Sequence, residues 1–261
     1  LFALPVDHDY FEDDREELFL FPADAFMRDL ARATQRLYYP ELLPDGARPR
    51  LTADTRGLRP GRLSEAFGTL CYGRLVEMLI YDCKGFVTPD GVDGGLVPRD
   101  VERWLLRRTA RSPARHLVHV PSNPVGWSAG KPAEWYPDVV EGGALGLARP
   151  KAGWNPGWGA QHDRLLQAAS ARRGLPLFVS GDIHSVAEQR ILRSGALDLS
   201  DNPVVSLISG TPATGPRGWP SAVRGVVAAR PAWLAGETVV PVTERNGFHL
   251  IDFEPGAVTI R

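Results

Sequence analysis

The chain has 261 residues, enough for one large domain or two small ones with a substantial core. Its hydrophobic content of 43% and charged content of 23% are those of an ordinary soluble globular protein. Lys and Arg number 30 against 31 Asp and Glu, so the formal net charge of −1 provides no general attraction for nucleic acid or anionic membrane. An anionic substrate must therefore be attracted by a local site.

The sequence contains no apolar run of the roughly 20 residues that a membrane-spanning helix needs, and no signal peptide. It begins with Leu rather than Met, so we expect further sequence upstream, and the compartment is undetermined. Cys71 and Cys83 lie in one apolar region without a CxxC motif. They are expected to be buried structural thiols, with a bridge between them left open.

The first 81 residues predict two strand regions separated by a helix and a loop. Residues 1–6 form an apolar strand, residues 25–39 have helical spacing up to Pro40, and residues 44–60 form a loop rich in Pro, Gly and Arg. Residues 70–81 then predict a β-hairpin with its turn at Gly73-Arg74.

The middle of the chain predicts a helix over residues 98–108, a strand over 116–120 and a long loop over 121–156. Four of the seven tryptophans lie in this loop or on its flank: Trp127, Trp135, Trp154 and Trp158. Because so many aromatic side chains must be buried, we expect a packed loop whose aromatic residues form a wall beside the functional site.

The last hundred residues are dominated by strand patterns. A helix is predicted over residues 158–172 and a buried strand over 175–180. Further strands are predicted over 186–193, 204–209, 248–253 and 257–261. The sequence thus predicts the α/β class, with a β-rich carboxyl-terminal half and no internal repeat.

Polar residues follow two of the predicted strands directly. Residues 1–6 end in Asp7-His8-Asp9, and residues 175–180 end in Gly181-Asp182-Ile183-His184. In the second segment alone, a turn cap and a hydrogen bond to a neighbouring strand would explain Asp182 and His184. Two such strand ends in one parallel sheet would meet at the same edge, where carboxylates and imidazoles can share a metal ion.

A set of motifs extends this pattern along nearly the whole chain. The segments are 1–10, Gly126–Lys131, Glu134–Asp138, Gln161–Leu166, Ser180–His184 and Asn246–Phe248. Together they resemble the PhoD-like (alkaline phosphatase D) family of calcineurin-like phosphoesterases. The resemblance implies a partial calcineurin-like metallophosphatase fold of layered β-sheets flanked by helices. Residues 1–261 would be a single domain that lacks the amino-terminal metal-motif portion.

The resemblance also implies a function and site residues. It implies hydrolysis of small phosphate mono- or diesters by a metal-bound hydroxide, with two or more metal ions (Fe, Ca, Mn or Zn). By motif position, Asp7, Asp182 and His184 match metal ligands and His8 matches the catalytic acid. Lys84 and Lys131 are expected to contact substrate phosphate. No nucleic-acid or membrane partner is expected.

The sequence departs from the family pattern at several points. Val6 stands where the family has Asp, Lys84 replaces an Arg, and Ser122-Asn123 stand where related enzymes often place a ligand histidine. The early Asp-x-His/Cys and Gly-Asp-x-x-Asp motifs are absent. We therefore expect at most half of a metal centre in this chain. A degenerate, non-catalytic binding or scaffold domain of the same fold is the main alternative.

A serine hydrolase is a lesser alternative. Gly126-Trp127-Ser128-Ala129-Gly130 satisfies the Gly-x-Ser-x-Gly pattern of a nucleophile elbow, with Ser128 as the nucleophile. The elbow requires a strand directly before it and a helix directly after it. Prolines on both sides disfavour both elements.

Overall fold

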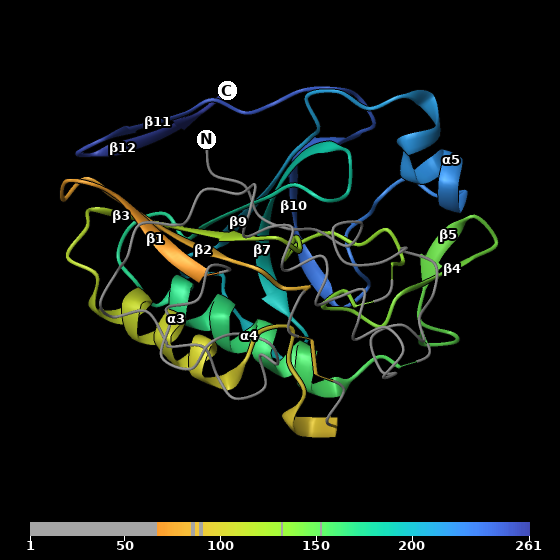
Figure 1. Ribbon diagram of the computed structural model, residues 1–261, viewed down its shortest axis with the longest axis horizontal. Coiled ribbons are helices and arrows are strands. Elements are labelled where there is room, and N and C mark those ends of the chain that lie inside the picture. Colours follow the sequence, from red (N-terminus) through yellow and green to blue (C-terminus); the bar gives the residue numbers. More distant parts are fainter. Residues whose placement is uncertain (1–66, 85–86, 89–90, 132, 152) are drawn as a thin grey trace, which may run out of the picture.

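The computed structural model describes residues 67–84, 87–88, 91–131, 133–151 and 153–261 (Figure 1). The predicted elements at 1–6, 25–39 and 44–60 lie outside these residues, as do Asp7 and His8. The elements are β1 (Phe67–Tyr72), β2 (Val76–Tyr81), η2 (Gly91–Asp93), α3 (Arg99–Arg111), β3 (His116–Pro121), β4 (Val139–Glu141), β5 (Ala144–Gly146), α4 (Pro156–Ser170), β6 (Leu177–Ser180), β7 (Val186–Ser194), β8 (Leu197–Asp198), β9 (Val204–Ser209), η3 (Pro216–Gly218), α5 (Pro220–Arg224), β10 (Leu234–Thr243), β11 (Ile251–Glu254) and β12 (Ala257–Ile260).

An eight-stranded sheet forms the centre of the described fold, in the order β1-β2-β3-β6-β9-β7-β10, with β8 paired to β7. The four consecutive strands β2, β3, β6 and β9 are parallel, and β1, β7 and β10 are antiparallel to their neighbours. The connection from β2 to β3 contains α3, and that from β3 to β6 contains α4. The carboxyl ends of the four parallel strands therefore meet at one edge, where ligand sites form in α/β sheets.

Local sequence signals define both long helices. In α3, Asp100 and Glu102 lie in the first turn and Arg108 and Arg111 in the last, which matches the helix dipole. Helix α4 begins at Pro156, and the Asn155 side chain accepts a hydrogen bond of 2.7 Å from the Gly157 amide. This cap satisfies one of the amides that the first turn of a helix leaves unpaired.

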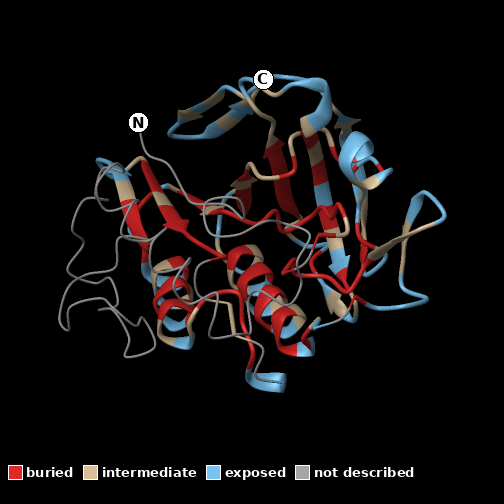
Figure 2. Cartoon of the chain, turned by 45° about the vertical axis from the view of Figure 1, so that its right-hand side comes forward, coloured by how far each residue is buried: buried red, intermediate tan, exposed pale blue. Residues whose placement is uncertain are grey.

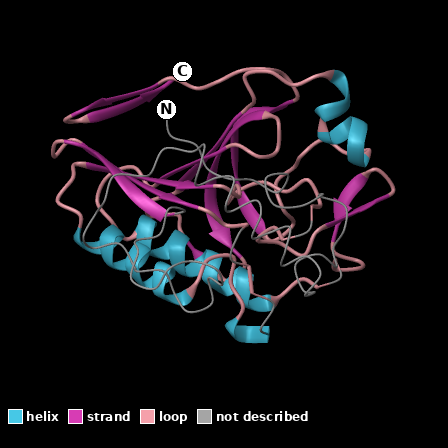
Figure 3. Cartoon of the chain, viewed as in Figure 1, coloured by secondary structure: helices cyan, strands magenta, loops and turns pink. Residues whose placement is uncertain are grey.

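Two different layers cover the two faces of the sheet. Helices α3 and α4 lie on one face and the β11–β12 hairpin on the other (Figures 1 and 3). The alternation of side chains along a strand divides the core accordingly: Phe178 joins the helix-side cluster, while Leu177 and Val179 belong to the hairpin side. Figure 2 shows that the helices turn their buried stripes to the sheet.

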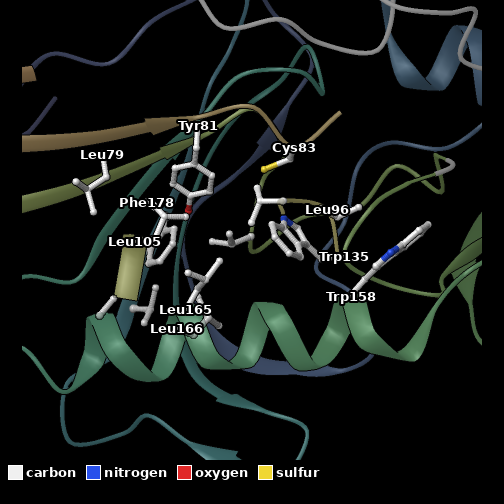
Figure 4. Close-up of a cluster of buried hydrophobic side chains, with 14 of the residues drawn as sticks. Leu79, Tyr81, Cys83, Leu96, Leu105, Trp135, Trp158, Leu165, Leu166 and Phe178 are labelled. Atoms are coloured by element: carbon white, nitrogen blue, oxygen red, sulfur yellow. The ribbon is translucent and has the colours of Figure 1, made fainter. Parts of the chain in front are cut away.

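The helix-side cluster is the larger core of the described residues. Tyr81 and Phe178 project from the sheet toward Leu165 and Leu166 of α4, and Trp135 and Trp158 extend this core toward the long loop (Figure 4). These six side chains are almost fully buried. Burial of a large apolar side chain contributes about 1.5–3 kcal/mol, so the cluster holds the helices against the sheet.

His119 is a polar residue inside this core. Its ring stacks on Phe178 with a centroid distance of 4.5 Å. The Thr109 hydroxyl donates to the Leu105 carbonyl at 2.8 Å, so it accepts from Nε2–H of His119 at 3.0 Å. Nδ1 of His119 then accepts from the Tyr81 hydroxyl at 3.3 Å. The neutral imidazole is thus fully bonded, and burial lowers the pKa of His119 to about 3.

We expect His119 to make the fold sensitive to acid. Its folded-state pKa lies below the value near 6.5 of an unfolded chain, so its stabilising effect is complete above pH 6.5 and is lost as the pH falls toward 3. At pH 4.5 the loss is about 2.7 kcal/mol, two pH units at about 1.36 kcal/mol each. Urea unfolding of the protein and of His119→Gln, at pH 4.5 and again above pH 6.5, measures this loss of stability. An equal loss of stability in both proteins would contradict the assignment of this acid sensitivity to His119.

The structure confirms most of the predicted elements after residue 66 and corrects others. The hairpin ends at Tyr81 as expected, and β9 has the predicted bounds. The sequence missed β10 and the short β4–β5 hairpin inside the long loop. Cys71 is exposed rather than buried, because it lies near the turn of the β1–β2 hairpin, and both cysteines are free thiols. No described helix is long and apolar enough to cross a membrane.

Candidate active site

The strand-end segment after β6 has an unusual backbone. Asp182 and His184 have φ values of 69° and 42°, and Ala133 has a φ of 49°. They are the three non-glycine residues with positive φ in the described part of the chain. Such conformations cost about 1–3 kcal/mol each and cluster at functional sites. The strain therefore supports a role for the segment beyond a simple turn.

Lys131 from the long loop contacts Asp182 directly. Its Nζ lies 3.2 Å from Oδ1 of Asp182, and both side chains are almost fully buried. The two residues are 51 positions apart in the sequence, and the meeting of β3 and β6 in the sheet brings them together. The structure thus places two of the predicted site residues in one buried ion pair.

His184 is held by a different segment. Its Nδ1 lies 2.6 Å from the carbonyl oxygen of Gly218 in η3. A carbonyl can only accept, so Nδ1 carries the proton and Nε2 of the neutral ring carries the lone pair. A Cβ at Gly218 would clash with Oγ1 of Thr214, and it would be in ordinary van der Waals contact with Nδ1 of His184. The imidazole is therefore oriented to offer Nε2 as a ligand or proton acceptor.

The long loop packs against this edge. Trp127 is buried with Ile183, the residue between Asp182 and His184. Tyr136 donates to the Val125 carbonyl and lies 2.6 Å from Nε2 of His162 on α4. The loop is packed as predicted, but of its aromatic residues Trp127 packs beside Ile183, while Trp135 and Tyr136 belong to the helix-side core instead of a wall at this edge.

Glu134 is the centre of a buried polar network inside the loop. It accepts from the Ser128 hydroxyl at 2.5 Å, the Ala129 amide at 3.0 Å and Nζ of Lys151 at 3.1 Å. Burial alone raises the pKa of Glu134, but Lys151 and these hydrogen bonds lower it more, so the carboxyl group is held ionised. The sequence analysis did not assign Lys151 a role. The sequence signal that could have drawn attention to Lys151 is the rarity of lysine, because the chain contains three lysines.

The same network argues against the nucleophile elbow. The hydroxyl of Ser128 donates to a carboxylate, and Ser128 pairs with Ala229 in an isolated antiparallel bridge. No described helix begins between Ser128 and Asn155. The strand–turn–helix geometry that exposes a catalytic serine is therefore not formed, and the side chain is fully buried.

Lys84 follows β2 at the same edge. Its backbone amide donates to Oδ1 of Asp82 at 2.7 Å, and its side chain is 1% exposed. Next to it, the Ser122 hydroxyl after β3 accepts from the Cys83 amide at 2.8 Å. The positive charge of Lys84 contributes to lowering the pKa of Lys151, whose burial is the main cause of that shift. Lys84 therefore lies close to the Glu134 network.

Of the three predicted metal ligands, Asp182 and His184 lie among the described residues. Among the described residues, no group of three or more His, Cys, Asp or Glu side chains could hold a metal ion. Oδ1 of Asp182 contacts an ammonium group, and an ammonium competes with a metal for the same oxygen. Asp182 and His184 therefore do not fit a metal centre by themselves. Asp7, the remaining predicted ligand, lies outside the described residues.

The fold and the strand-end residues define a mixed α/β protein with a polar site at the carboxyl edge of its parallel strands. The fold is similar to that of a solved structure of PhoD, with a TM-score of 0.52 and 12% sequence identity. The match covers 78% of this chain and 38% of the PhoD chain. No family model and no curated protein matches the sequence. At this identity the likeness shows a PhoD-like fold.

Proposed function

We propose that this chain belongs to a metal-dependent hydrolase of small phosphate mono- or diesters, and that residues 1–261 form one domain of it. The observation that carries the proposal is the position of Asp182 and His184 directly after β6, at the carboxyl edge of the parallel strands of a PhoD-like fold. The PhoD-like fold supports it, and so do the sequence segments that resemble motifs of PhoD-like phosphatases. A site of this kind joins a carboxylate, a cation and an imidazole, which are the groups that phosphoester hydrolysis needs.

The proposal assigns roles to the named residues. Asp182 and His184 would hold metal ions together with Asp7, and Fe, Ca, Mn and Zn are the candidate metals. His8 would be the proton donor, and Lys84 and Lys131 would contact the substrate phosphate. The carbonyl of Gly218 positions His184 by accepting from Nδ1–H. A metal supplies charge neutralisation and an activated water in such enzymes.

A non-catalytic scaffold of the same fold is the second candidate. The scaffold is favoured by the lack of a three-ligand cluster among the described residues and by the contact between Lys131 and Asp182. The two candidates differ in one measurable property, namely chelator-sensitive turnover of a phosphate ester.

The test is a hydrolysis assay with p-nitrophenyl phosphate and bis-p-nitrophenyl phosphate. The chain, and the natural protein where that is longer, is stripped with a chelator and supplied separately with Mn, Fe, Zn and Ca. We expect release of p-nitrophenol that depends on added metal, and that is stronger in a longer natural protein that supplies further metal ligands besides Asp7, Asp182 and His184. Lack of turnover with every metal in both proteins would support the scaffold instead.

A further inference from the structure

The segment Asn246–Phe248 lies between β10 and β11 and contains none of the proposed ligands. It runs beside the loop that follows β9. Thr211 and Asn246 form an isolated parallel bridge, and the Gly247 amide donates to the Thr211 carbonyl at 3.0 Å. The Asn246 side chain adds two bonds, since Oδ1 accepts from the Thr214 amide at 2.8 Å and Nδ2 donates to the Thr214 carbonyl at 3.4 Å. Asn246 therefore holds both polar groups of the Thr214 backbone.

The same loop reaches His184 a few residues later. The Gly218 amide donates to the Gly215 carbonyl at 2.9 Å, which closes the turn of η3. The Gly218 carbonyl accepts from Nδ1–H of His184 at 2.6 Å. A Cβ at Gly218 would clash with Oγ1 of Thr214, so Gly218 packs closely against Thr214. A continuous series of contacts thus leads from Asn246 through Thr214 and Gly218 to the imidazole.

The loop has little packing of its own to hold the Gly218 carbonyl in place. Residues 212–217 are exposed apart from Thr214, which is half-buried. Segments with few buried apolar contacts open more easily than the core of a fold. A second tie supports the first, because the Glu244 carboxylate accepts from the Ser221 amide at 2.8 Å and from the Ser221 hydroxyl. Both ties come from residues that directly follow β10, so the end of this strand anchors the loop.

We infer that Asn246 is a positioning residue for His184 and acts through Thr214 and Gly218. Its two bonds keep the Gly218 carbonyl at Nδ1–H, so the lone pair of the neutral ring stays on Nε2. A histidine that serves as a ligand or proton acceptor is commonly oriented in this way through its other nitrogen. The placement of the ring does not depend on the reaction, and only its effect on the rate rests on the proposed function.

The first test is NMR of the ring nitrogens of His184 in metal-free protein labelled at histidine, at one mildly alkaline pH. Correlations between ring protons and nitrogens distinguish the two neutral tautomers. The His184 signals are those that disappear in His184→Gln. We expect a single Nδ1–H form in the unchanged protein. In Asn246→Ala we expect exchange between the Nδ1–H and Nε2–H forms, because the carbonyl is no longer held.

Two further variants separate this effect from a general loss of stability. Asn246→Asp keeps the oxygen that accepts from the Thr214 amide, so it should retain the Nδ1–H form. Asn202→Ala is the matched control, because the Asn202 amide group donates to three carbonyls of the segment 170–174. Asn202 precedes β9 and thus lies at the opposite end of the parallel strands from His184. Its replacement should lower stability and leave the His184 signals unchanged.

Gly218 offers an independent test of the same contacts. Gly218→Ala places a methyl group against Oγ1 of Thr214 and should displace the carbonyl, which again releases His184. The added substitution Thr214→Ala removes that oxygen and leaves the new methyl group 3.5 Å from Cβ of residue 214, an ordinary contact. The double variant should therefore recover the Nδ1–H form that the single variant loses. A structural role unrelated to His184 would not produce this recovery.

The rate of hydrolysis connects the ring position to catalysis. With metal supplied, Asn246→Ala should lower kcat/KM for bis-p-nitrophenyl phosphate by about 10- to 100-fold, and Asn202→Ala should keep the rate. Folded Asn246→Ala and Gly218→Ala proteins that both retain the single Nδ1–H form would overturn the inference, whatever their rates. Loss of that form in a protein without turnover on any metal would support the inference and remove the proposed function.

Discussion

Asp182→Asn is expected to lower kcat/KM for an aryl phosphate ester by about a thousandfold while leaving the fold intact. The variant removes the negative charge that faces Nζ of Lys131 at the end of β6. Asparagine tolerates positive φ as aspartate does, so the backbone at 69° is retained. The loss in a variant that is shown to be folded therefore reports the charge of the carboxylate, and the check on folding is needed because the buried Lys131 ammonium loses this ion-pair contact.

The measurement compares initial rates of the metal-supplied protein and of the variant, with circular dichroism as the check on folding. Asp201→Asn is a suitable control, because Asp201 is exposed in a turn away from the strand-end segment. It should keep the full rate. An Asp182→Asn protein that is folded and retains activity within about tenfold would remove Asp182 from the proposed machinery.

Glu134→Ala is expected to destabilise the protein by about 3–5 kcal/mol, the cost of leaving one member of a buried ion pair without its partner. The substitution removes the acceptor of the Ser128 hydroxyl, the Ala129 amide and Nζ of Lys151 together. Lys151 would remain buried beside Lys84, and burial already lowers its pKa. Urea unfolding at neutral pH measures the change in the free energy of unfolding.

The double variant Glu134→Gln with Lys151→Met is the control for this network. It removes both charges and keeps an amide acceptor, so it should recover much of the lost stability. The network also has a pH dependence. Because the folded-state pKa of Glu134 is lowered, its contribution is present above the unfolded value and is lost as the pH falls through the folded one. A loss below about 1 kcal/mol for Glu134→Ala would mean that the loop is held by its aromatic residues alone.

The long loop links these predictions to the site. It is fixed at Tyr136 and His162 on one side and at Glu134 and Lys151 on the other. Lys131 lies just before these anchors in the sequence and its carbonyl oxygen accepts from Nζ of Lys151, so its contact with Asp182 depends on the packing of the segment. A destabilised loop should therefore weaken phosphate binding even where Lys84 and Lys131 are unchanged.

Local sequence patterns predicted the framework of this protein. Two apolar segments on either side of a Gly-Arg turn predicted the β1–β2 hairpin, and an apolar run breaking at Gly181 predicted the end of β6. Proline and charge signals located α3 to within three residues at its end. Strands, turns and helices depend on the spacing of apolar residues and on the residues next to them in the chain. A short segment of sequence is therefore enough to predict them. Strand β10 was missed because it is an edge strand containing Gly236 and Pro241, residues that disfavour strands.

Only the tertiary structure decided which charges meet. The pairing of Lys131 with Asp182 follows from the order of the strands, and that order depends on how α3 and α4 cross the sheet. The same is true of the burial of Lys84, which the sequence presents as an ordinary polar residue after a strand. Solvent exclusion is a property of everything packed around a residue, so a side chain's charge state and partner cannot be inferred from its own segment. The sequence by itself thus determined most strands of the central sheet and the polar residues at the end of β6, and the fold determined that Lys131 contacts one of them.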